Sequence, residues 1–363
     1  MSDRVDVIVA GGGIVGAATF FELASSGHAV TLVERAIVAS GATAWSGGVV
    51  RLMHDDPESA DRAVFGWHYY RSLRRRGVGV PFNETGFLYF PRPEREAFAR
   101  AEVDRLSERV PIEWLDARAL ERRFGHLLAD TRGGAVHEPW SGYVDPREVT
   151  RALVRAGVRH GGRLVEGVEL HGFTRESDYE ICAHTSAGDL STRAIVLATG
   201  VRTPALLDAL GIAHDLFNRD IQVDLRAPAE SLVRQPAFID DVYDLNGRPD
   251  ADSGAVLIGH PTGLDSTSVT PEPIRPQHSQ RIVEEGRKRF AWIDASESRG
   301  GRRHPECYAP DPLARVQSVD ERGDVVIATG FSGGGLKMAP WAANHVVSVL
   351  SDVITPTTRS TTR

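Results

Sequence analysis

The sequence predicts a fold of the α/β plus α+β class, in which a discontinuous nucleotide-binding domain carries an inserted domain built on an antiparallel sheet. Three observations predict it. A strand, a glycine loop and a helix open the chain over residues 5–26. A buried-strand pattern at 191–200 and a strand, glycine loop and helix at 324–350 follow much later. Residues 221–259 alternate short strands with polar turns, as antiparallel sheets do.

The opening unit has the pattern of a dinucleotide-binding turn. The β-rich run Val5–Ala10 leads into Gly11-x-Gly13-x-x-Gly16, which opens a helix. Gly11 permits the tight turn, Gly13 lets the backbone approach a pyrophosphate, and Gly16 lets helix and strand pack closely. The helix N-terminus adds partial positive charge. A Rossmann-like β-α-β unit is therefore favoured over a purely structural glycine turn.

Glu34 indicates which dinucleotide fits. It ends the second predicted strand, 29–33, and lies 18 residues beyond Gly16. A carboxylate there accepts hydrogen bonds from ribose hydroxyls and repels a 2′-phosphate, so NADP is disfavoured. We expect Ile14, Val15 and Arg35 to contact the same cofactor. NAD and FAD both remain open at this point.

The rest of the chain is expected to alternate helices and strands. The predicted helices are 94–110, 116–124, 147–157 after Pro146, and a last one through Leu350 with Pro340 in its first turn. The predicted strands are 163–173, 180–185, 191–200, 221–225, 237–243, 255–259 and 324–329, with 246–254 as a polar turn. We assign 1–80, 143–212 and 300–354 to the nucleotide-binding domain, 81–142 and 213–299 to the substrate domain, and 355–363 to a disordered tail.

Composition favours small-molecule chemistry. The chain is 41% hydrophobic and 25% charged with a net charge of −7, which gives no basic face for nucleic acid or an anionic membrane. We expect no signal peptide, because the N-terminal residues lack its pattern, and we see no apolar run of membrane-spanning length. The two cysteines are far apart and the 13 histidines are scattered. We expect a cytoplasmic monomer or small homo-oligomer without a metal.

Three later segments resemble the FAD-dependent D-amino-acid oxidase superfamily. One predicted strand ends in Ala198-Thr199-Gly200, which resembles the strand end that contacts the cofactor in two-domain flavoproteins. Residues 40–51, Ser-Gly-Ala-Thr-Ala-Trp-Ser-Gly-Gly-Val-Val-Arg, resemble the loop beside the isoalloxazine. Residues 330–337, Gly-Phe-Ser-Gly-Gly-Gly-Leu-Lys, are similar to a Gly-Phe-Ser-Gly-His-Gly-Phe-Lys segment of the monomeric sarcosine oxidases. An NAD dehydrogenase has no reason to carry these segments, so the resemblance implies FAD. It also implies cofactor contacts at Ser46, Gly47, Gly48, Val168, Thr199, Gly200, Gly333, Gly334, Gly335, Leu336 and Lys337.

The C-terminal glycine loop has a chemical rationale of its own. At a helix N-terminus it presents several backbone N–H groups, which suit the negative charge that the flavin pyrimidine ring gains on reduction. Stabilising that charge raises the flavin potential. The alternative is a flexible turn between strand and helix.

Arg51 and Lys337 are the predicted substrate ligands. The resemblance implies that Arg51 pairs with a substrate carboxylate and that Lys337, one of only two lysines in the chain, supports the same group. A planar guanidinium can donate two parallel hydrogen bonds to a carboxylate, and lysine adds a point charge. An amino acid is therefore the preferred substrate, although Arg51 as a solvated surface charge is the open alternative. Tyr243 is a further candidate for a substrate hydrogen bond, or a buried tyrosine with a satisfied hydroxyl.

The sequence also departs from these relatives. Leu257 stands where the sarcosine oxidases carry an oxygen-activating lysine, and His260 nearby could supply charge if protonated. O2 or another acceptor therefore takes the electrons. Those enzymes link flavin to a cysteine, which places His304 or Cys307 at the attachment site; non-covalent FAD is favoured. Gly48 stands where the sarcosine oxidases carry a basic residue, three positions before the arginine that binds the carboxylate.

The expected reaction is oxidation of the C–N bond of an amino acid, with a secondary or cyclic amine favoured, to an imine by hydride transfer to flavin N5, with O2 as acceptor. One alternative is a dehydrogenase, or a subunit of a hetero-oligomeric dehydrogenase, that uses another acceptor. A second is an FAD-dependent 2-hydroxy-acid oxidase or hydroxylase.

Overall fold

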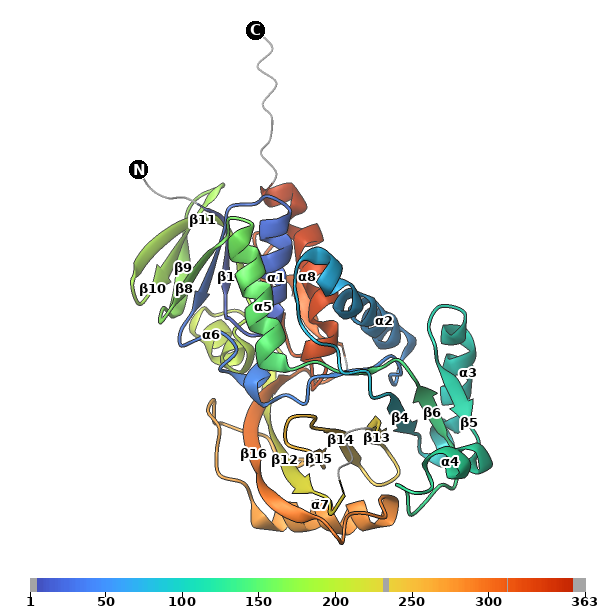
Figure 1. Cartoon of the computed structure of the whole chain (residues 1–363). Helices are drawn as coiled ribbons and strands as arrows, with labels where there is room; N and C mark the ends of the chain where they lie inside the picture. The colour runs from blue at the N-terminus through green and yellow to red at the C-terminus, as the bar shows by residue number, and fades with distance from the viewer. Residues whose placement is uncertain (1–4, 231–234, 312, 355–363) are drawn as a thin grey trace.

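Two large sheets organise the computed structural model, which describes residues 5–230, 235–311 and 313–354. The first sheet and its helices fill the upper part of the view in Figure 1, and the second sheet fills the lower part. The predicted tail, 355–363, lies outside the described residues. No helix among those described combines the length and the apolar character needed to cross a membrane.

The first sheet has a parallel centre. Strands β18, β11, β1, β2 and β8 are parallel neighbours, β17 joins β18 antiparallel, and β10 with β9 continues from β11 as an antiparallel extension. The central strands are nearly continuous runs of buried Val, Ile, Leu and Ala, as expected when both faces are covered. The strands are β1 (Val5–Ala10), β2 (Val30–Glu34), β8 (Arg163–Glu166), β9 (Leu170–Ser177), β10 (Glu180–Thr185), β11 (Gly188–Leu197), β17 (Arg315–Ser318) and β18 (Val325–Thr329).

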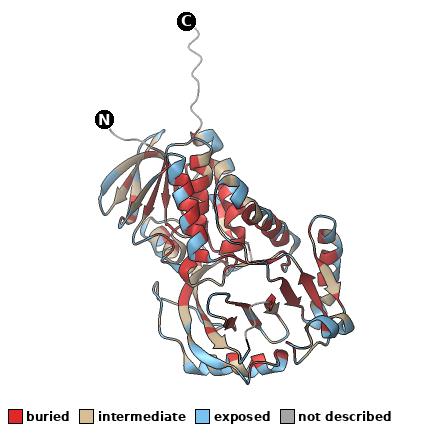
Figure 2. Cartoon of the chain, in the orientation of Figure 1, coloured by how far each residue is buried: buried red, intermediate tan, exposed pale blue. Residues whose placement is uncertain are grey.

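Three helices lie side by side on one face of this sheet: α1 (Ile14–Ser25), α5 (Pro146–Arg159) and α8 (Gly335–Ile354) (Figure 1). Figure 2 shows their inner faces buried. α1 is buried almost all round because it is the middle helix: it packs on the sheet and is flanked by α5 and α8. The opposite face packs against the β9–β10 hairpin and α6 (Thr203–Ala209).

The second sheet runs in the order β16-β12-β15-β14-β13-β4-β6-β5. Its pairs are antiparallel except β13 with β4, which is parallel. Helices α7 (Pro276–Arg289) and α4 (Ala117–Phe124) contribute to the core on one face. The strands are β4 (Phe87–Phe90), β5 (Glu113–Leu115), β6 (Ala135–Glu138), β12 (Phe217–Ala227), β13 (Ala237–Asp240), β14 (Leu245–Pro249), β15 (Val256–Gly259) and β16 (Glu297–Tyr308). The other elements are α2 (Pro57–Ser72), α3 (Glu96–Ser107), the pair β3 (Val49–Val50) and β7 (Gly142–Tyr143), and the 3-10 turns 42–45, 73–76, 93–95 and 200–202.

Several sequence expectations about the elements are wrong. The predicted strand 163–173 is two strands, β8 and β9, because Gly167 turns the chain with φ +73°. The predicted turn 246–254 contains β14, which pairs with strands on both sides. The predicted strand 237–243 ends at Asp240, and Asp244 turns the chain with φ +53°.

Pro340 lies in the second turn of α8, not the first. Proline has no N–H, so the carbonyl of Leu336, four residues earlier, loses its helical donor. The hydroxyl of Tyr70 on α2 donates to that carbonyl at 2.6 Å instead. The helix therefore continues through Pro340 with its polar groups satisfied.

The domain limits remain a proposal. The strands of the first sheet come from the segments assigned to the nucleotide-binding domain. Most strands of the second sheet come from 81–142 and 213–299, the segments assigned to the substrate domain. One strand departs from this division: β16 pairs along β12 in the second sheet, so the limit at 299/300 falls inside a strand.

Candidate active site

A cavity of about 480 Å³ opens at the carboxyl ends of β1, β2 and β11. This is where open α/β sheets bind ligands. Its wall combines the opening glycine loop, residues 40–46, the turn after β8, the end of β11, part of β16 and the C-terminal glycine loop. The predicted cofactor residues that line it are Gly11, Gly13, Ile14, Val15, Glu34, Arg35, Ser46, Val168, Thr199, Gly200, Gly333, Gly335 and Leu336.

The opening loop depends on glycine. Gly11 has φ +109°, and a Cβ there would lie 2.3 Å from the carbonyl oxygen of Ala198. A Cβ on Gly16 would lie 1.9 Å from the carbonyl oxygen of Gly11, so Gly16 serves packing and does not line the cavity. Thr43 Oγ1 accepts from the N–H of Ile14 at 3.0 Å. Within the described residues the N–H of Gly13 has no acceptor, so it is available to an anion at the start of α1.

Glu34 is fixed by two backbone groups. Its Oε2 accepts from the N–H of Gly12 at 2.6 Å and its Oε1 from that of Ala36 at 2.8 Å. The N–H of Val168 donates to the carbonyl of Glu34 at 3.0 Å, so the predicted ribose and adenine residues lie together. The carboxylate keeps lone pairs for sugar hydroxyls.

The C-terminal glycine loop forms the other end of the wall. Ser332 and Gly333 have φ +47° and +83°, and Gly334 donates to the carbonyl of Phe331 at 2.7 Å. The N–H groups of Ser332 and Gly333 have no acceptor in the part of the chain that the structure describes. They precede α8, so this loop is suited to developing negative charge.

His304 and Cys307 both lie on β16 and line the cavity. The ring of His304 stacks on Trp45, with centroids 6.2 Å apart. Burial raises the pKa of the Cys307 thiol, which keeps it from the nucleophilic thiolate form. This environment favours a non-covalent cofactor.

Arg51 and Lys337 form a pair of cations near this loop. Arg51 follows β3, and its Cζ lies 5.6 Å from the ring centroid of Phe87. Lys337 is in the first turn of α8 and is 8% exposed. Burial, and then the charge of Arg51, lower the pKa of Lys337 to about 7. Neither side chain has a hydrogen bond or ion pair within the described residues.

Two residues that the sequence did not indicate surround this pair. Glu138 at the end of β6 is fully buried, and its oxygens accept from the N–H groups of Leu52 and Met53 at 2.8 and 2.7 Å. It thereby fixes the backbone beside Arg51. His54 is 8% exposed and its Nε2 has no partner in the described chain. Burial and the two cations lower the pKa of His54, so its ring is neutral at pH 7.

Two predicted residues lie away from the cavity. The hydroxyl of Tyr243 donates to Asp130 Oδ2 at 2.8 Å, which is the satisfied tyrosine that the sequence left open. His260 lies beside α7, with Nδ1 2.9 Å from the carbonyl of Pro261 and its ring 5.7 Å from that of His278. The structure brings neither residue into contact with Arg51 or Lys337.

Arginines surround the loop that was predicted to lie beside the isoalloxazine. Arg248 pairs across the sheet with Leu257, so the two side chains share a face. Arg248 Nε donates to the carbonyl of Gly47, and Arg302 Nη1 donates to that of Trp45 at 3.5 Å. Gly48 has φ +73°, and a Cβ there would meet the carbonyl of Val144. Gly47, Gly48 and Gly334 therefore shape the loops without lining the cavity.

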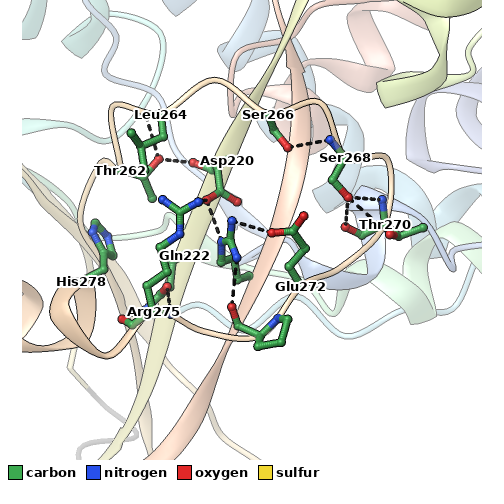
Figure 3. Close-up of polar contacts among 12 residues, drawn as sticks. Asp220, Gln222, Thr262, Leu264, Ser266, Ser268, Thr270, Glu272, Arg275 and His278 are labelled. Atoms are coloured by element: carbon green, nitrogen blue, oxygen red, sulfur yellow. Dashed lines mark hydrogen bonds and ion pairs between the residues drawn. The ribbon is translucent and has the colours of Figure 1, made fainter.

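The segment 260–275 contributes Val269, Thr270 and Pro271 to the cavity wall. Figure 3 shows how this segment is anchored. Arg303 on β16 bonds Asp220 and Glu272, and Gln222 Oε1 accepts from the N–H of Arg275 at 2.8 Å. This wall is thus attached to β12 and β16.

One group of potential metal ligands lies elsewhere. Atoms of Cys182, His184 and Asp189, on β10 and β11, lie within 4.8 Å of one another. His184 Nδ1 is 3.0 Å from Asp189 Oδ1, which is also an ordinary ion-pair distance. The expectation of no metal stays a prediction.

Comparison with known proteins decides the family. The profile of the FAD-dependent oxidoreductase family DAO matches residues 6–349. The chain belongs to this family. The predicted recognition, fold class, FAD cofactor and oxidoreductase class are thereby confirmed. The free N–H groups at the starts of α1 and α8, and the glycines that a Cβ would block, fit FAD.

The chain is similar to curated relatives over much of its length. It is 26% identical to a 4-methylaminobutanoate oxidase (formaldehyde-forming) of Paenarthrobacter nicotinovorans, over 93% of this chain and 42% of that protein. It is also 26% identical to a glycine oxidase of Geobacillus kaustophilus, over 60% of each. The chain spans less than two thirds of the length of these relatives.

Solved structures show the same fold. Glycine oxidase from Geobacillus kaustophilus superposes with a TM-score of 0.81 at 19% identity, covering 97% of this chain and 94% of that one. L-proline dehydrogenase from P. horikoshii gives a TM-score of 0.85 at 23% identity, with the same coverage.

Proposed function

We propose that the protein oxidises the C–N bond of an amino acid, with a secondary or cyclic amine favoured. The observation that carries this proposal is the pair of a half-buried Arg51 and a buried Lys337, neither of which has an ion-pair partner within 4.0 Å in the described residues. The charge of Arg51 lowers the pKa of Lys337, and Glu138, Asp55 and Asp241 act on Arg51 only at longer range. Burying charge without a partner is costly, so the pair is suited to an anionic ligand. A carboxylate matches the guanidinium fork.

The side chains would orient the substrate. Arg51 binds the carboxylate, and Lys337 holds a proton at Nζ that gives this carboxylate a second donor. Glu138 keeps the backbone of Leu52 and Met53 in place, so Arg51 stays positioned. FAD, when bound, would supply the two-electron oxidant that accepts a hydride at N5 from the C–H beside nitrogen, which leaves an iminium ion that becomes the imine by losing a proton to solvent. The substrate amine reacts in its neutral form, so no side chain is needed as general base.

The names of two relatives support this substrate class. Glycine and 4-methylaminobutanoate each combine an amine with a carboxylate. We propose the same combination for this chain.

Anaerobic reduction of the flavin tests the reaction. The FAD-bound protein is mixed without oxygen with primary, N-methylated and cyclic amino acids, and bleaching of the flavin absorbance is followed. We expect bleaching by at least one of them. A 2-hydroxy acid could bind the same cations, so 2-hydroxy acids and NADPH are included. Bleaching by either of these, with none by any amino acid, would overturn the assignment in favour of a hydroxy-acid oxidase or a hydroxylase.

We propose O2 as the acceptor, with a dehydrogenase or a subunit of a hetero-oligomeric dehydrogenase as the second candidate. Leu257 is buried on the face that also carries Arg248, so the residue at the oxygen-activating position is apolar and favours the second candidate. Arg248 and Arg302 nevertheless bring positive charge to the loop at Trp45–Gly47. Mixing the reduced protein with air decides: reoxidation within seconds supports an oxidase, and reoxidation over minutes excludes one.

The cellular location and the oligomeric state are also proposals. We propose a cytoplasmic monomer or small homo-oligomer, which sedimentation of the purified protein and fractionation of the source cells would check.

A further inference from the structure

A second cavity opens next to the cation pair. It is lined by Asp55, Arg92, Glu94, Arg95 and Asp241. Two of these acids, Asp55 and Asp241, raise the pKa of Arg51, and Asp55 also raises that of Lys337, so they lie close to the proposed carboxylate site.

Strand β4 carries residues that contact both Arg51 and the second cavity. Phe87 and Tyr89 are two residues apart, so their side chains lie on one face of the sheet. Arg51 Cζ lies 5.6 Å from the Phe87 ring centroid, and the hydroxyl of Tyr89 donates to Asp241 Oδ2 at 2.6 Å. Asp241 is thus held on the same side of the sheet as Arg51.

The carboxylates of Asp55 and Asp241 have no cationic partner within 4.0 Å in the described residues, although two arginines share their cavity. Arg92 Nε donates to the backbone carbonyl of Asp241 at 2.7 Å, and its Nη2 pairs with Asp244. Arg95 Nη2 donates to the backbone carbonyl of Asp55 at 2.6 Å. The two guanidinium groups therefore bind backbone carbonyl oxygens and Asp244, and not the carboxylates of Asp55 and Asp241.

The local charges favour a cation there. Three acids, Asp55, Glu94 and Asp241, and two arginines line the cavity, and one of these arginines, Arg92, pairs with Asp244 outside it. Burial raises the pKa of Asp241 and the charge of Asp55 raises it further, whereas the hydrogen bond from Tyr89 and the charges of Arg51 and Arg92 lower it. A substrate carboxylate on Arg51 would add another negative charge. A positive group on the same substrate would offset it.

We propose that this second cavity binds a positively charged nitrogen on the substrate side chain, so that the substrate is a basic amino acid with an ammonium or guanidinium group beyond the oxidised C–N bond. The α-carboxylate lies on Arg51 and Lys337, and the distal nitrogen lies between Asp55 and Asp241. This inference rests on the proposed amino-acid oxidation.

Pairs of amino acids matched in length test it. Ornithine is compared with norvaline, and lysine with norleucine, in both enantiomers and with free or N-methylated α-nitrogen. The rate constant of anaerobic flavin reduction divided by Kd is measured for each. We expect the basic member of at least one pair to exceed its apolar partner by about 10- to 100-fold, the range of one hydrogen-bonded ion pair.

Asp55→Asn and Asp241→Asn should each lower that preference toward unity, because each should lower the efficiency of the basic member more than that of its apolar partner. Asp244→Asn is the matched control, since Asp244 pairs with Arg92 and does not line the cavity; it should keep the preference. Flavin absorbance and melting temperature verify that each variant is folded. Equal efficiencies within every pair, or equal losses for basic and apolar members, would overturn the inference and leave amino-acid oxidation standing. If no amino acid bleaches the flavin, both proposals fail.

Discussion

The charge of half-buried Arg51 lowers the pKa of buried Lys337, which follows the loop at residues 330–335 in the chain. Neither has an ion-pair partner within 4.0 Å in the described chain, although Asp55 raises the pKa of both from a longer distance. Repulsion and burial make this arrangement unfavourable in the free protein, and a bound anion relieves both effects. This is the physical basis for proposing that the site binds a carboxylate.

Carboxylate binding should depend on pH through Lys337. Its pKa of about 7 means that the charged form is lost as the pH rises through 7, whereas a bound carboxylate favours the charged form. We expect the Kd of acetate, measured by flavin difference spectra, to be lowest below pH 7 and to increase above it. Lys337→Arg should flatten this increase, because arginine stays charged. An identical pH profile in both proteins would show that Lys337 does not titrate at the site.

Glu138→Gln tests the positioning of Arg51. Glu138 accepts from Leu52, Met53 and the hydroxyl of Ser141, and an amide would set an N–H against one of these donors. We expect about 1–3 kcal/mol of lost stability and a higher Kd for acetate. Ser141→Ala removes one donor, keeps both backbone bonds, and should keep acetate binding. A lower melting temperature with unchanged acetate binding would reduce Glu138 to a structural role.

Gly11→Ala should abolish most FAD retention. The added Cβ would lie 2.3 Å from the carbonyl oxygen of Ala198, and alanine disfavours φ +109°. Gly27→Ala is the matched control, since φ there is +87° but nothing lies within 4 Å of the added Cβ. The ratio of flavin to protein absorbance after purification compares the two. Full retention of FAD in Gly11→Ala would show that the loop does not hold the cofactor as described.

Acid denaturation should release the yellow colour into the supernatant. Burial raises the pKa of Cys307, so the thiol is protonated and a covalent flavin is not expected. Colour that stays with the precipitate would contradict this. In that case Cys307→Ser and His304→Ala would identify the attachment, since both residues line the cavity.

The residues assigned to the nucleotide end could be predicted to lie together because their signals are local. One β-α-β unit contains the strand Val5–Ala10, the glycines at 11, 13 and 16, and Glu34. Within such a unit, the spacing in the sequence determines which residues lie close together. The loop at 330–335 has the same character. These residues line or shape the cavity as expected.

The substrate end could be predicted only in part, because distant segments build it. Glu138 reaches Leu52 across 86 residues, and Tyr89 reaches Asp241 across 152. A single carboxylate in a short strand carries no local signal for such a contact. Arg248 could not be predicted for another reason. Residues 246–254 are rich in polar and turn-forming residues, which indicate a turn. In the structure Arg248 lies in a strand and its side chain is buried.

The most direct test of the account compares an amino acid with the amine that lacks its carboxylate, in the wild-type protein and in Arg51→Met. The quantity measured is the rate constant of anaerobic flavin reduction divided by Kd. The account predicts that the wild type prefers the amino acid by about 10- to 100-fold, and that Arg51→Met loses this preference while the amine is little affected. Equal losses for both compounds would contradict the claim that Arg51 binds the substrate carboxylate.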